Sequence, residues 1–139
     1  MRILIAEDDP ASRNFLFKFL KKYGDCDLTV DGFEALDAFL IAVEENNPYD
    51  LLCIDIMMPK FDGLKVLKAV RDIEIEKKIV LKKRAEIILT TALDKAHIAQ
   101  KSFEYDYDAY IAKPIDTNKL FEIMQNMGLI ETNRKGEEL

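Results

Sequence analysis

Five short apolar runs alternate along this chain with segments whose apolar residues recur at helical spacing. The runs cover residues 3–6, 26–30, 51–54, 87–89 and 109–112. Such alternation is typical of parallel strands joined by crossover helices, because each helix returns the chain to the same edge of the sheet. We therefore predict an α/β fold with a doubly wound, five-stranded parallel sheet and helices on both faces.

Start and stop signals place the helices between these runs. The expected helices cover residues 10 to about 23, 31 up to the break at 46–48, a segment that begins near 63, about 94 to 103, and 116–127. In the first helix, Phe15, Leu16, Phe19 and Leu20 form the predicted inner stripe. Residues 73–84 are charge-rich and compatible with either an extended helix or a loop. Gly128 ends the last helix, so we expect one domain over residues 1–128 and a polar tail over 129–139.

Composition narrows the classes of partner. The chain has 139 residues, 49% of them hydrophobic, which suits one domain with its own core. A net charge of −6 repels phosphate backbones and anionic lipids, so neither nucleic acid nor a membrane is an expected direct partner. Cys26 and Cys53 lie in apolar runs and are expected to be buried free thiols. The apolar run after Met1 is too short for a signal peptide, so the expected compartment is the reducing cytoplasm.

Polar residues follow four of the five predicted strands at the point where each strand ends. Acidic residues 7–9 follow the first strand and Asp55 follows the third. Two threonines, Thr90 and Thr91, follow the fourth strand and Lys113 follows the fifth. Because ligands of a doubly wound sheet bind outside the carboxyl ends of its strands, we expect these side chains to share one pocket.

The predicted pocket suits phosphoryl chemistry with magnesium. Several carboxylates in one pocket repel one another unless a cation balances them, and Mg²⁺ favours carboxylate, water and phosphate oxygens. A zinc site is excluded, since His97 is the only histidine and is expected to be a solvated side chain. An aspartate beside Mg²⁺ and a lysine can attack phosphorus and hold the product as an acyl phosphate. We predict that Asp55 is this nucleophile, with Lys113 and a threonine hydroxyl stabilising the phosphoryl oxygens.

Five motifs that occur in a fixed order strengthen this prediction. They are Glu7-Asp8-Asp9-Pro10, Asp55-Ile-Met-Met-Pro59, Asp62-Gly63, Thr90-Thr91-Ala92 and Tyr110-Ile-Ala-Lys113-Pro114. In this order they resemble the receiver domain of bacterial response regulators, the CheY-like family, over roughly residues 1–128. The resemblance implies a flavodoxin-like sheet with the strand order 2-1-3-4-5.

The resemblance assigns roles around the metal. Asp55 would accept the phosphoryl group and would also lie beside Mg²⁺. Asp8 would bind the metal directly, and Glu7 would act on it through water, with Asp9 as a weaker candidate. The main-chain carbonyl of Met57 would be a further ligand.

The resemblance also implies a switch. Lys113 would hold the phosphate, and Thr91 matches the family's hydroxyl residue, with Thr90 as the alternative. Tyr110 would turn inward when the threonine moves toward the phosphate. The Lys113–Pro114 peptide bond is expected to be cis.

A receiver domain implies a function in a phosphorelay and not an enzyme with external substrates. The expected phosphodonor is a sensor histidine kinase or a histidine phosphotransfer protein. The expected output is contact with a downstream protein, and the chain could also form a homodimer.

One alternative function is that of a pseudo-receiver, which binds partners without phosphorylation. Another is a hydrolase of the haloacid dehalogenase type, which the absence of Asp-x-Asp at Asp55 disfavours. Three departures from the family are the long segment 73–84, Asp106-Tyr107 in place of Gly-Ala, and the two apolar residues Met57 and Leu93 beside the phosphate site, from which we expect slow self-dephosphorylation.

Overall fold

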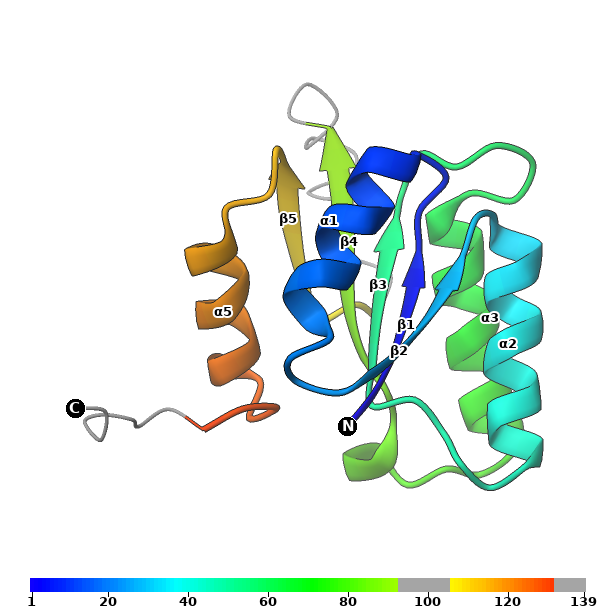
Figure 1. Ribbon diagram of the computed structural model, residues 1–139. Coiled ribbons are helices and arrows are strands. Elements are labelled where there is room, and N and C mark those ends of the chain that lie inside the picture. The colour runs from blue at the N-terminus through cyan, green and yellow to red at the C-terminus, as the bar shows by residue number, and fades with distance from the viewer. Residues whose placement is uncertain (93–105, 132–139) are drawn as a thin grey trace.

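Five parallel strands form one sheet in the order β2-β1-β3-β4-β5 (Figure 1). The computed structural model describes residues 1–92 and 106–131. The strands are β1 (Arg2–Ala6), β2 (Asp25–Thr29), β3 (Leu51–Asp55), β4 (Glu86–Ala92) and β5 (Ala109–Lys113). The predicted fold class and strand order are therefore confirmed. Leu93 and the helix predicted over residues 94–103, with His97, lie outside the described residues.

Helices cover both faces of the sheet. Helices α1 (Pro10–Leu20) and α5 (Thr117–Asn126) lie on one face, and α2 (Gly32–Glu44) and α3 (Gly63–Glu76) lie on the other (Figure 1). One apolar core joins Leu16 of α1 and Met124 of α5 to the sheet, and a second joins Phe39 of α2 and Leu67 of α3 to its other face. No helix in the described part of the chain is long and apolar enough to cross a membrane.

Several element boundaries differ from the sequence prediction. Helix α1 ends at Leu20 because the next residues form a tighter turn, in which the Tyr23 N–H bonds the Leu20 carbonyl at 2.9 Å. Phe15, predicted to face the core, is 43% exposed, whereas Leu16 and Leu20 are buried. The segment 73–84 combines both predicted options: α3 continues to Glu76, and a short 3₁₀ turn follows at Leu81–Lys83.

The two cysteines differ in burial. Cys53 lies in the central strand β3 and is buried, and burial raises the pKa of its thiol to about 12. Cys26 is only half-buried, contrary to the prediction, because β2 is an edge strand. Both are free thiols.

The predicted boundary between domain and tail at residue 128 stays a prediction. Gly128 has a φ of +79°, a conformation that favours glycine at the end of a helix. Leu129 and Ile130, which follow it, still pack against the core beneath α1 and α5.

A buried ionic network joins α3 to the beginning of β4 and β5. Arg71, 8% exposed, donates hydrogen bonds to the carboxylates of Glu74 at 2.7 Å and Asp108 at 3.1 Å. It also donates to the main-chain carbonyls of Ala85 at 2.9 Å and Asp106 at 2.8 Å. All of the guanidinium nitrogens therefore have partners, as a buried arginine requires.

Candidate functional site

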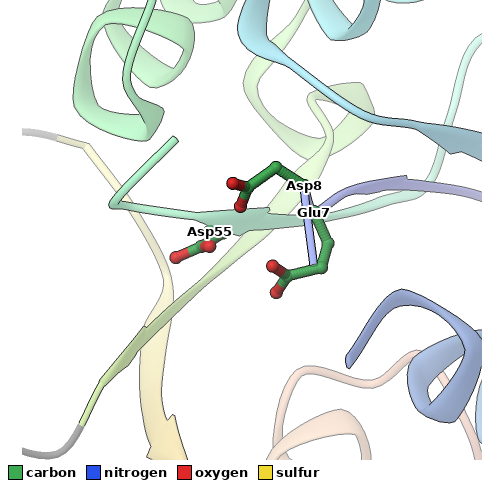
Figure 2. A group of neighbouring side chains, drawn as sticks. All are labelled: Glu7, Asp8 and Asp55. Atoms are coloured by element: carbon green, nitrogen blue, oxygen red, sulfur yellow. The ribbon is translucent and has the colours of Figure 1, made fainter. Parts of the chain in front are cut away.

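Three carboxylates meet at the carboxyl edge of the sheet. Glu7 and Asp8 directly follow β1, and Asp55 ends the neighbouring strand β3. One oxygen from each residue lies within 4.8 Å of one oxygen from each of the others. Figure 2 shows the three carboxylates around a common space. Glu7 is fully buried and Asp55 is 4% exposed, so their charges are poorly solvated.

Lys113, the last residue of β5, connects two of these carboxylates. Its Nζ atom lies 2.6 Å from Glu7 Oε1 and 3.2 Å from Asp55 Oδ2. Burial alone would lower the pKa of Lys113, but its contacts with Glu7 and Asp55 outweigh burial and raise the pKa. Lys113 is therefore a permanent cation that faces Asp55, as predicted from the sequence.

The loop after Asp55 is held by main-chain hydrogen bonds. The Met57 N–H donates to Asp55 Oδ1 at 3.1 Å, and the Ile56 N–H donates to the Thr90 carbonyl at 2.9 Å. The Gly63 N–H closes the loop on the Ile56 carbonyl at 2.9 Å. A Cβ atom on Gly63 would clash with the main chain at Asp55, which requires glycine here. The Asp62-Gly63 motif was the sequence signal for this contact, although sequence reasoning gave Gly63 no role.

Asp9 does not belong to the carboxylate cluster. Its side chain accepts a hydrogen bond from the Ser12 N–H at 2.8 Å and caps α1. This hydrogen bond lowers the pKa of Asp9. Asp9 is thus a helix cap, and Asp8 is the acidic residue that joins Glu7 and Asp55.

Both threonines lie inside β4, and not beyond its end as predicted. Successive side chains of a strand point to opposite faces of the sheet, so Thr90 and Thr91 lie on different faces. Thr90 is opposite Asp55 in the ladder and shares a face with Ile88. Thr91 shares the other face with Leu89, and the half-buried Tyr110 packs against the core on that face. Thr91 is fully buried, and its hydroxyl donates to the Ala92 carbonyl at 3.3 Å. The structure thus places Thr91, and not Thr90, on the face of Tyr110, whose ring lies 6.4 Å from that of Tyr107.

Burial also perturbs the titration of the site. It raises the pKa of Glu7 from its ordinary value near 4.5 to about 7. The hydrogen bond with Lys113 opposes this rise, and the charge of Asp55 adds to it. Near neutral pH, Glu7 therefore lies between its neutral and charged forms.

This raised pKa predicts a pH-dependent stability. The folded chain keeps a proton on Glu7 that the unfolded chain, with its ordinary pKa, has already lost. The stabilisation is therefore complete below pH 4.5 and is lost as the pH rises through about 7. As the pH rises from about 5 to about 8 and Glu7 loses its proton, we expect the free energy of unfolding to fall by roughly 1 to 3 kcal/mol. Urea unfolding in EDTA measures this change.

Glu7→Gln is the control, because glutamine stays neutral at every pH. Subtracting its pH profile from that of the wild type removes the contributions of all other titrating groups. Parallel profiles for the two proteins would contradict the assigned shift of Glu7.

The Lys113–Pro114 peptide bond is cis, as predicted. The site thus combines three carboxylates, a lysine and a buried threonine at the carboxyl ends of β1, β3, β4 and β5. Such a site can bind a divalent cation and a phosphoryl group. Residues 3–125 match the family model of the response regulator receiver domain. The chain belongs to this family and is a receiver domain of two-component signalling.

The chain is similar to parts of longer proteins. It is 30% identical to hybrid signal transduction histidine kinase I of Dictyostelium discoideum, over 99% of this chain and 8% of the relative. It is 32% identical to transcriptional regulatory protein DltR of Streptococcus agalactiae, over 86% of this chain and 48% of the relative. The chain therefore spans less than half the length of these relatives.

A solved structure with a similar fold contains a metal. The receiver domain of sensor histidine kinase PA1611 from Pseudomonas aeruginosa PAO1 has a magnesium ion coordinated in its active site cleft. The sequence identity is 25% and the TM-score is 0.72, with 90% of this chain and 94% of that chain covered.

Proposed function

We propose that this chain accepts a phosphoryl group on Asp55 from a phosphohistidine of a sensor kinase or a histidine phosphotransfer protein. The observation that carries the proposal is the meeting of Asp55 with Lys113 at 3.2 Å, beside two further carboxylates. Membership of the receiver family and the histidine kinase among the relatives support the choice of donor. The cytoplasm is the proposed compartment, and the two free thiols are compatible with it.

Mg²⁺ is the proposed cofactor, and the residues present fit it. Three carboxylates with one oxygen each within 4.8 Å form a hard, oxygen-only donor set. Glu7, Asp8, Asp55 and the main-chain carbonyl of Met57 are the residues that would hold the ion. When bound, Mg²⁺ neutralises charge on the phosphoryl oxygens.

The residues of this chain position and balance the transfer. An Asp55 carboxylate oxygen forms a bond to phosphorus as the bond between phosphorus and the donor nitrogen breaks, and that electron pair returns to the imidazole. Lys113 offsets the negative charge of the transferred group. No general base is needed, because the attacking carboxylate carries no proton.

Thr91 and Tyr110 are the proposed switch. A phosphoryl group on Asp55 provides an acceptor for the Thr91 hydroxyl, which otherwise donates a weak hydrogen bond to the Ala92 carbonyl at 3.3 Å. Movement of Thr91 alters the packing on the face that it shares with Tyr110. The outcome is a change in the surface offered to a downstream protein.

The test is phosphorylation by a small phosphodonor. We expect acetyl phosphate with Mg²⁺ to add a single phosphoryl group, detected as intact mass, and EDTA to prevent the addition. The chain should not release phosphate continuously from phosphoesters, because it is proposed to act only on itself. No adduct on the folded chain would favour the pseudo-receiver, and sustained phosphate release would favour a hydrolase.

A further inference from the structure

The segment between α3 and β4 has a charge opposite to that of the whole chain. Five of the eight residues from 77 to 84 are basic and none is acidic, in a chain of net charge −6. The basic residues are Lys77, Lys78, Lys82, Lys83 and Arg84. Among the described residues, none of the four lysines forms an ion pair. These charges are therefore available to an external acidic group.

Large apolar side chains are exposed among these charges. Ile75 is 60% exposed, Val80 is 54% exposed and Leu81, at the start of the 3₁₀ turn, is 75% exposed. Grouped exposure of this kind is typical of an interaction surface, because burial of these side chains in a complex is favourable.

Two adjacent hollows lie beside this segment. The first, of about 480 Å³, has apolar walls that include Val43, Ile79 and Val80, and lysines that include Lys77 and Lys78. The second, of about 420 Å³, is lined by the basic residues Lys82, Lys83 and Arg84, by the apolar Leu129, and by two acidic residues, Asp50 and Glu86, so its net charge is less positive than that of the first. Pro48 and Lys83 line both hollows, so the two are neighbours. We call the two together the basic groove.

The basic groove lies far from the carboxylate site. Its 3₁₀ turn precedes β4 and lies near the amino ends of the strands, opposite the arrowheads in Figure 1. Asp55 is at the carboxyl end of β3. A molecule in the basic groove therefore leaves Asp55 accessible to its phosphodonor.

We propose that the basic groove docks an acidic segment of a partner protein that also carries an apolar side chain. The lysines complement carboxylates of the segment, and the apolar walls complement its apolar side chain. A concave groove can enclose a peptide, whereas a flat bilayer cannot enter it. A membrane or a nucleic acid would also meet the rest of the chain, whose net charge of −6 opposes a polyanion, whereas a short acidic segment would meet only the groove.

A random peptide library displayed on phage and selected against the full chain tests this proposal. We expect the enriched peptides to combine Asp or Glu with at least one apolar residue. Synthetic copies labelled with fluorescein should bind in an anisotropy titration and weaken as salt rises. Vesicles of phosphatidylserine and phosphatidylcholine serve as the membrane probe. We expect the chain to bind these vesicles more weakly than it binds the selected peptides.

Charge-neutralising variants locate the binding. Lys77→Gln/Lys78→Gln/Lys83→Gln should bind the selected peptides about tenfold more weakly. The matched control Lys18→Gln/Lys65→Gln/Lys119→Gln removes the same charge from exposed positions on α1, α3 and α5 and should bind as the wild type does. Both variants should retain the acetyl phosphate adduct, so this test and that of Asp55 fail separately.

Three results would overturn the proposal. They are enrichment of peptides without acidic residues, equal binding by the basic-groove variant and the wild type, and lysine-dependent vesicle binding stronger than peptide binding.

Discussion

Asp55→Asn is expected to abolish the phosphoryl adduct while the chain remains folded. A carboxamide lacks the negative charge that makes the aspartate oxygen a nucleophile, so no acyl phosphate forms. Folding tolerates the change because Lys113 keeps its contact with Glu7 at 2.6 Å, and the amide oxygen still accepts the Met57 N–H. Intact mass after treatment with acetyl phosphate and Mg²⁺ measures the adduct, and circular dichroism measures the fold.

Asp9→Asn is the matched control for this experiment. Asparagine caps a helix about as well as aspartate does, so the hydrogen bond to the Ser12 N–H survives. The same change of charge, made two residues after Glu7, should leave the adduct intact. An adduct on Asp55→Asn, or its loss in Asp9→Asn, would contradict the assigned roles of these two aspartates.

The location of the site could be predicted because its residues follow the most regular part of the sequence. Central parallel strands are buried on both faces and are continuous apolar runs, so Asp55 is visible as the first charge after one. Lys113 is visible in the same way at the end of β5. Once the fold class is known, the carboxyl edge gathers these ends without any knowledge of side-chain geometry.

The direction of individual side chains could not be predicted. Glu7, Asp8 and Asp9 are consecutive acids, and only the start of α1 determines that Asp9 turns away to cap the helix. The face of each threonine depends on where β4 ends, and the strand continues through Thr90 and Thr91 to Ala92. The half-burial of Cys26 follows from the edge position of β2, which the apolar run itself does not reveal.

The Arg71 network had no local signal in the sequence. Arg71 and Glu74 are three residues apart on α3, a spacing that usually indicates a solvated pair on a helix surface. Their burial depends on Asp106 and Asp108, which follow more than thirty residues later. Asp106 stands where the family commonly has glycine, and Arg71 Nε donates to its main-chain carbonyl at 2.8 Å and lies 3.8 Å from its carboxylate.

Arg71→Met is expected to destabilise the chain by about 3 to 5 kcal/mol, because it leaves a buried charge without its partner. Glu74 is 1% exposed, and of its partners in the described part of the chain it would keep only the Ala85 N–H, at 2.8 Å. Methionine fills much of the space of the arginine side chain, so the loss reports on charge more than on a cavity. The free energy of unfolding in urea measures the effect.

Two further variants test whether the unpaired charge of Glu74, and not another effect of the substitution, causes the loss of stability. Arg71→Met/Glu74→Gln removes the charge but keeps an oxygen for the Ala85 N–H, so it should recover part of the loss. Lys68→Met breaks an exposed pair with Asp72 on the same helix and should cost less than about 1 kcal/mol. A single variant as stable as Lys68→Met, or a double variant with no recovery, would contradict the role of the buried charge.

The Arg71 network also affects the site, because it anchors the chain where β5 begins. Asp108 accepts hydrogen bonds from Arg71 at 3.1 Å and from the Ile87 N–H at 2.7 Å, and β5 starts at the next residue. Lys113 ends that strand, and Gly63 begins α3 against the main chain of Asp55. Helix α3 and strand β5 both contact Asp55, through Gly63 and Lys113 respectively. Loss of Arg71 therefore loosens the attachment of these two elements to each other at a distance from Asp55. We expect Arg71→Met to slow formation of the acetyl phosphate adduct even under conditions where the variant remains folded.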